Sequence, residues 1–104
     1  MSQPSHVTRK VLTAIDTCRA VPVNLRIGRQ RTSVRLDPSG LEALDRLAQA
    51  EGISRNRVAE LVHERLGPGM SLASALRAFV LAYWLHRAEF TMEQAVGGEG
   101  PPQA

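Results

Sequence analysis

Two short segments of alternating apolar and polar residues constrain the fold of this chain most, because helix-forming sequence follows them directly. In residues 21–27 every second residue is apolar, and residues 31–36 alternate in the same way. A period of two residues is typical of a β-strand that buries one face. Gly28, Arg29 and Gln30 lie between the two segments and are interpreted as a turn. A single strand cannot bury its apolar face alone, so residues 31–36 pair either with the preceding segment or with another chain.

The sequence after the second alternating segment predicts two helices. Asp37 can cap a helix whose first residue is Pro38, and apolar residues then recur at helical spacing over residues 38–50. Gly52 is able to take the positive φ that ends a helix. A second helix is predicted over residues 54–66, before a Gly-Pro-Gly sequence that stops it.

Further helical patterns flank this central part. Residues 7–20 place an apolar residue at every third or fourth position, which predicts a helix after a short leader. A third helix of the C-terminal half begins at Ser71, and its apolar stripe is wider than one small monomer can cover. We therefore predict a mainly α-helical chain with a short antiparallel β-ribbon. Its expected parts are a leader and short helix (1–20), the strands and two helices (21–66), a C-terminal helix (67–92) and a flexible tail (93–104).

Positive charge is concentrated at the N-terminal end of this 104-residue chain. The first 36 residues hold seven basic side chains and one acidic side chain, whereas the remaining residues hold six basic and nine acidic ones. Twelve of the thirteen basic residues are arginines. An arginine guanidinium offers a planar fork of donors that suits phosphate groups and guanine edges. The charge therefore favours contact with nucleic acid over a merely solvated basic face.

Candidate DNA-binding residues follow from two features of the predicted elements. A two-stranded ribbon fits the major groove of B-DNA, and the polar residues of the second segment share one face of it. We predict that Arg31, Ser33 and Arg35 read base edges. The free N–H groups at the start of the helix over 54–66 form an anion site. We predict that Ser54, Arg55 and Asn56 hold a backbone phosphate there.

Other function classes find little support in the sequence. The chain has one cysteine, and its three histidines are scattered, so we expect no metal, no disulfide and no cofactor. No phosphate-binding loop, nucleophile elbow or dinucleotide fingerprint occurs, and we expect no enzyme. No apolar run approaches the ~20 residues of a membrane span, and the first residues lack a signal-peptide profile, so we expect a cytoplasmic protein.

Residues 31–66 resemble the ribbon-helix-helix domain of the MetJ/Arc/CopG type. The shared features are the alternating strand, the acid-proline helix start, the L-x-x-L-x-x-L-A pattern and the later G-x-S-x-x-x-V-A-E-L pattern. The wider stretch 22–85 resembles a bacterial subgroup with a strand before the core and an S-x-A-L-R-x-F-V-L helix after it. These features read here as Val23–Gly28 and Ser74–Leu81, where the second is S-A-L-R-A-F-V-L and lacks the residue between the serine and the alanine of the pattern.

The resemblance implies an obligate intertwined homodimer that binds double-stranded DNA and regulates transcription, as a repressor does. In that family each of two chains gives one strand to the ribbon. By position, Arg31, Ser33 and Arg35 take the base-reading places, and Ser54, Arg55 and Asn56 take the phosphate-anchoring place. Because residues 21–27 can form a hairpin with 31–36, Asn24, Arg26 and Arg29 are second-tier DNA candidates.

Alternatives remain open at the level of sequence. Residues 71–90 either complete the core of the dimer or expose an apolar patch for a tetramer or a partner protein. Small ribbon-helix-helix proteins are often antitoxins that also regulate their own transcription, which makes a toxin a candidate partner. A protein-interaction module without a role in DNA binding is the third interpretation.

Overall fold

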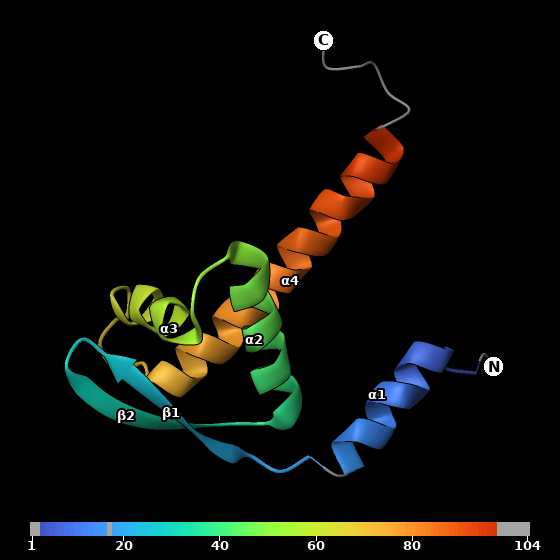
Figure 1. Cartoon of the computed structure of the whole chain (residues 1–104). Coiled ribbons are helices and arrows are strands. Elements are labelled where there is room, and N and C mark those ends of the chain that lie inside the picture. The colour runs from blue at the N-terminus through green and yellow to red at the C-terminus, as the bar shows by residue number, and fades with distance from the viewer. Residues whose placement is uncertain (1–2, 17, 98–104) are drawn as a thin grey trace.

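Helices predominate in the computed structural model, which describes residues 3–16 and 18–97 (Figure 1). Its sheet has two strands. In chain order the elements are α1 (His6–Asp16), β1 (Val21–Ile27), β2 (Gln30–Leu36), α2 (Pro38–Glu51), α3 (Arg55–His63) and α4 (Leu72–Gly97). The mainly α-helical class with a short antiparallel ribbon is confirmed.

The two strands form a hairpin within the chain. They pair antiparallel along their whole length, from Val21 opposite Leu36 to Ile27 opposite Gln30. The connection is the two-residue turn Gly28-Arg29, in which Gly28 has a φ of 61°. Two-residue hairpin turns need positive φ, which glycine adopts without steric cost. Of the two alternatives that the sequence left open, the structure therefore shows residues 31–36 paired with the preceding segment of the same chain.

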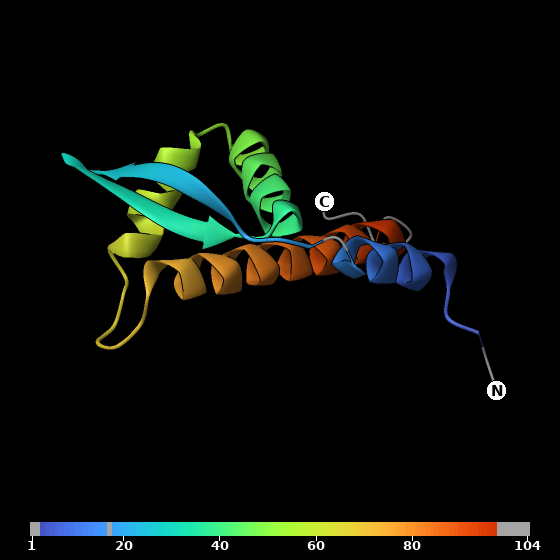
Figure 2. The same cartoon turned by 90° about the horizontal axis from the view of Figure 1, so that it is seen from below.

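The hydrophobic core lies between one face of this hairpin and three helices. Alternate strand residues are buried, with exposed fractions of 2–6% at Val23, Leu25, Val34 and Leu36. Helix α3 packs against β1, while α4 packs against β2 and also contacts α2 and α3. Figure 2 shows α4 running beneath the hairpin. The helices therefore cover one face of the ribbon and leave the other face to solvent.

Side-chain caps fix the starts of α2 and α3. The Asp37 carboxylate accepts a hydrogen bond from the Gly40 backbone N–H at 2.8 Å, and the Ser54 hydroxyl accepts one from the Arg57 backbone N–H at 3.0 Å. Such caps satisfy N–H groups that have no partner inside the helix. At the other end of α2, Gly52 takes a φ of 70° and ends the helix.

Removal of the cap on α2 is a first test of this fold. Asp37→Ala is expected to lower the free energy of unfolding by about 1 kcal/mol, because the Gly40 N–H loses its acceptor. Urea denaturation followed by circular dichroism measures the change. Asp37→Asn is the matched control, since asparagine caps helices as well as aspartate does. An equal loss in both variants would contradict a capping role for this side chain.

Several element ends differ from the sequence predictions. Helix α1 ends at Asp16 instead of residue 20, and Val21, which precedes a proline, enters the strand in extended conformation. Helix α3 ends at His63 instead of residue 66, and residues 64–66 continue as a tighter turn in which the Leu66 N–H bonds to the His63 carbonyl.

The last helix is longer than predicted. Helix α4 reaches Gly97, whereas the sequence pattern predicts a flexible tail from residue 93. Residues 91–97 include methionine, glutamate, glutamine and alanine, which are all good helix formers. The rest of the predicted tail, residues 98–104, lies outside the described residues. Within the described ranges no helix combines the length and hydrophobicity needed to cross a membrane.

Candidate nucleic-acid interface

The solvent-facing side of the hairpin carries a compact polar surface. Its residues face each other across the two strands, with Pro22 opposite Arg35, Asn24 opposite Ser33 and Arg26 opposite Arg31. All six side chains are exposed, while the residues between them are buried or partly buried on the helix side. We call these six residues the ribbon face. The three predicted base-reading residues thus lie together, and two of the second-tier candidates stand beside them on the other strand.

Positive charge is densest at the turn end of the ribbon face. Arg26 and Arg31 are direct cross-strand neighbours, and Arg29 occupies the turn between their strands. Like charges directly opposite one another destabilise a strand pair by roughly 0.2–1 kcal/mol. Among the residues that the structure describes, no carboxylate forms an ion pair with any of these three arginines. The Glu60 carboxylate also lies at this turn, where it accepts a hydrogen bond from the Gly28 backbone N–H at 3.4 Å, but its ion pair is with Arg57.

Arg35, at the opposite end of the ribbon face, is tied to its own chain. One of its guanidinium nitrogens donates a hydrogen bond to the Ala20 carbonyl at 3.1 Å. Its backbone carbonyl accepts a hydrogen bond from the Arg77 guanidinium of α4, also at 3.1 Å. Arg35 consequently fixes the chain just ahead of β1 and connects the ribbon to α4, so its side chain is less free than those at the turn.

The predicted phosphate-binding residues lie at the start of α3, beside β1. The Asn56 side-chain oxygen accepts a hydrogen bond from the Arg26 backbone N–H at 3.0 Å. The Ser54 hydroxyl caps the helix through the Arg57 N–H. The hydrogen bond between Asn56 and Arg26 holds the start of α3 against β1. The predicted phosphate-binding residues therefore lie next to the ribbon face.

The third of these residues, Arg55, is held by a carboxylate that no sequence pattern indicates as its partner. Its Nε and Nη2 atoms donate to the two carboxylate oxygens of Asp45 on α2, at 2.7 and 2.8 Å. This two-point hydrogen bond raises the pKa of Arg55 above its ordinary value. Asp45 and Arg55 are 10 residues apart and lie on different helices, α2 and α3. The spacing of residues along one helix therefore could not have indicated this pair.

The Arg55–Asp45 pair is expected to contribute modestly to stability. Both side chains are more than a third exposed, and water screens ion pairs of this kind to roughly 0.2–1 kcal/mol. A double-mutant cycle of Arg55→Ala and Asp45→Ala, read by urea denaturation, should return a coupling energy in that range. A coupling energy of zero would show that the pair does not hold α2 against α3 in solution.

Comparison with known proteins places this geometry in a family. The family described as the ribbon-helix-helix domain matches residues 20–84, which is more than half of the chain and includes the hairpin, α2, α3 and the first half of α4. Neither the curated proteins nor the solved structures gave a match. Ribbon-helix-helix domains are DNA-binding domains of regulators and antitoxins, without enzymatic activity, and usually form dimers. The chain belongs to the ribbon-helix-helix family.

Proposed function

We propose that this protein is a dimeric transcriptional regulator that inserts the ribbon face of its hairpin into the major groove of DNA. The observation that carries the proposal is the cluster of Arg26, Arg29 and Arg31 at the turn, which has no carboxylate partner in the described part of the chain. A cluster of like charges costs folding free energy, and the phosphates of a duplex would supply the ion pairs that these arginines do not make within the chain.

The side chains of the ribbon face have the chemistry to distinguish bases. Arginine donates two hydrogen bonds to guanine, asparagine pairs with adenine, and serine meets several base edges. In the proposed complex Arg31, Ser33 and Arg35 read bases from β2. Asn24 and Arg26 read them from β1, because they stand directly across the ribbon. Both strands of one chain would therefore contribute to the recognition of one half-site.

The start of α3 would anchor the backbone of the same DNA. Its Ser54 and Asn56 side-chain oxygens already accept hydrogen bonds inside the chain, and Arg55 is paired with Asp45. We therefore assign the phosphate contact mainly to the backbone N–H groups of the first helical turn, where the helix dipole favours an anion. The three side chains would position this turn beside the groove.

Selection from genomic DNA tests the proposal. The full chain is mixed with sheared genomic duplex at about 0.15 M salt, and the bound fragments are sequenced. We expect an enriched inverted repeat, since a two-fold dimer reads two half-sites. We also expect an affinity that falls linearly with salt on a log–log scale. Retention of all fragments alike, or no salt-sensitive retention of any duplex, would refute sequence-specific DNA binding.

A further inference from the structure

The start of α3 carries two arginines that are paired with carboxylates of the same chain. Arg55 is the first residue of this helix and Arg57 is the third. The Arg55 Nε atom lies 2.7 Å from Asp45 Oδ1, and the Arg57 Nη1 atom lies 3.4 Å from Glu60 Oε1. Each pair joins one positive and one negative charge, so these two arginines add no net charge to the first turn of α3.

The arginines at the turn of the hairpin are not paired in this way. Within residues 3–16 and 18–97, Arg26, Arg29 and Arg31 form no ion pair with a carboxylate. Glu60 reaches this turn through a hydrogen bond to its backbone, yet its ion pair is with Arg57 of α3. The chain therefore pairs the arginines of the helix start and leaves those of the turn unpaired, although the two groups are neighbours.

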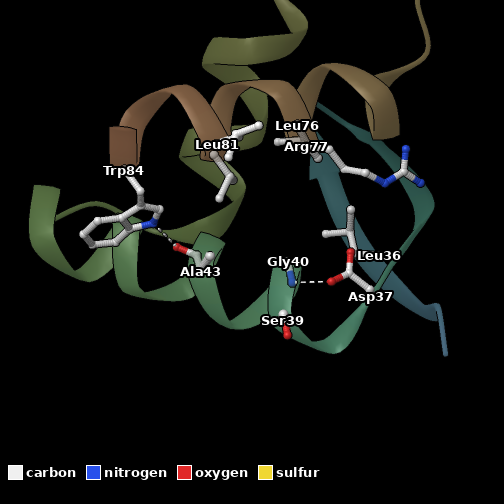
Figure 3. A pocket seen from close by; sticks show the side chains of 10 residues that line it. Leu36, Asp37, Ser39, Gly40, Ala43, Leu76, Arg77, Leu81 and Trp84 are labelled. Atoms are coloured by element: carbon white, nitrogen blue, oxygen red, sulfur yellow. Dashed lines mark hydrogen bonds between the residues drawn. The ribbon is translucent and has the colours of Figure 1, made fainter. Parts of the chain in front are cut away.

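Arginine is also unpaired at the end of β2, where Arg77 of α4 meets the ribbon. The Arg77 guanidinium donates to the backbone carbonyl of Arg35, which carries no charge. Arg77 and Leu36 line one apolar cavity of about 450 Å³ between α2 and α4 (Figure 3). Asp37 lines the same cavity, but its carboxylate caps α2 and belongs to none of the ion pairs of the described residues. Pairing with a carboxylate is therefore not general among the arginines beside the ribbon.

An arginine that is paired with a carboxylate adds little to the attraction between a protein and a duplex. Sequence-independent binding arises because unpaired basic side chains replace the counterions of the phosphates. The carboxylate of Asp45 lies far closer to Arg55 than the ~8 Å Debye length at physiological salt, so the two charges act on an approaching phosphate together. This cancellation depends on where the carboxylate lies. It does not depend on how much the exposed pair contributes to the free energy of unfolding.

We propose that the carboxylates of Asp45 and Glu60 limit sequence-independent DNA binding by neutralising the two arginines at the start of α3. The inference rests on the proposed function, which places this turn against the DNA backbone. The attraction to phosphates is then concentrated on the ribbon face, whose arginines also have the chemistry to read bases. The start of α3 contacts phosphate through its backbone N–H groups. Asp45 and Glu60 act only through the arginines that they pair with.

Neutral substitutions of the two carboxylates test the proposal on a duplex of random sequence. Asp45→Asn keeps the shape of the side chain and frees the charge of Arg55. One additional phosphate contact should steepen the slope of log affinity against log salt by about 0.9, which amounts to roughly fivefold tighter binding at 0.15 M salt, counted from 1 M. Glu60→Gln frees Arg57 and should act in the same direction, and the double variant should show both changes. Fluorescence anisotropy at several salt concentrations measures the slope, and circular dichroism checks the fold.

Two further variants separate this neutralisation from other causes. Glu42→Gln removes one negative charge as well, but it frees Arg46, which lies beside Trp84 on the α4 side of α2, so the slope should stay unchanged. Asp45→Asn combined with Arg55→Ala should lose the gain, because no freed guanidinium remains. A gain that persists without Arg55 would overturn the proposal. Weaker binding by Asp45→Asn alone would also overturn it, since Asp45 would then hold Arg55 in place for a phosphate.

Failure of this inference and failure of the proposed function give different results. A random duplex needs no selected site, so a steeper slope in Asp45→Asn without any enriched genomic repeat would refute sequence specificity and support the neutralisation. An enriched repeat with the same slope in the unaltered chain and in all variants would support the proposed function and overturn the neutralisation. If neither the unaltered chain nor the double variant retains any duplex at about 0.05 M salt, both are wrong.

Discussion

Arg31→Ala is expected to weaken binding to the selected DNA site and to stabilise the free protein at the same time. The loss of one two-point contact with guanine costs about 1–3 kcal/mol of discrimination between bases. Removal of the charge opposite Arg26 relieves a repulsion of about 0.2–1 kcal/mol in the hairpin. Fluorescence anisotropy with specific and random duplexes measures the first effect, and urea denaturation measures the second.

The opposite signs of the two effects make this experiment informative. Arg46→Ala is the matched control, because Arg46 is an exposed arginine on α2 that is paired with Glu42. It should leave the ratio of specific to random binding unchanged and should not raise stability. If Arg31→Ala lowers binding to both duplexes by the same factor, Arg31 contacts phosphate and does not read a base.

Leu25→Ala is expected to produce the largest loss of stability among the variants considered, about 2–5 kcal/mol. Leu25 is 2% exposed and lies in β1, on the face of the hairpin that the helices cover. Its truncation leaves a cavity below the strand that carries Asn24 and Arg26. Small domains have a total stability of about 5–15 kcal/mol, so urea denaturation should show a large shift of the midpoint.

If Leu25→Ala fails to fold, two more conservative substitutions at the same position still test whether Leu25 is part of the core. Leu25→Ile conserves the side-chain volume and should cost less than about 1.5 kcal/mol. Leu25→Val removes one carbon and should fall between the other two variants. A cost near zero for all three would mean that β1 is not part of the folded core, and the in-chain hairpin would then be wrong.

Local sequence patterns predicted the elements that short-range physics governs. The alternation in residues 21–27 and 31–36 reappears as the two faces of the hairpin, with Arg31, Ser33 and Arg35 on the exposed one. Asp37 and Ser54 cap the helices that they were expected to begin. The two faces of the hairpin depend on alternation along a strand, and each cap depends on a hydrogen bond between residues three apart in the sequence. Both kinds of pattern can be recognised from neighbouring residues.

The partners of the candidate site could not be predicted in this way. The bond from the Arg26 backbone to Asn56 spans 30 residues, and the one from Arg55 to Asp45 spans 10 residues. Each depends on how α3 is oriented against β1 and α2, which the packing of the buried residues decides. Residue type alone suggested a phosphate contact for Arg55, whereas the folded chain gives its guanidinium an internal carboxylate.

The amino-acid sequence by itself determined the order of strands and helices, the polar face of the ribbon and the concentration of arginine near it. Only the tertiary structure decided that both ribbon strands come from one chain, and that the Asp45 carboxylate holds the Arg55 guanidinium. The reason is that alternation shows which face of a strand is buried but not which strand lies beside it. Strand pairing and contacts between residues far apart in the sequence follow from three-dimensional packing.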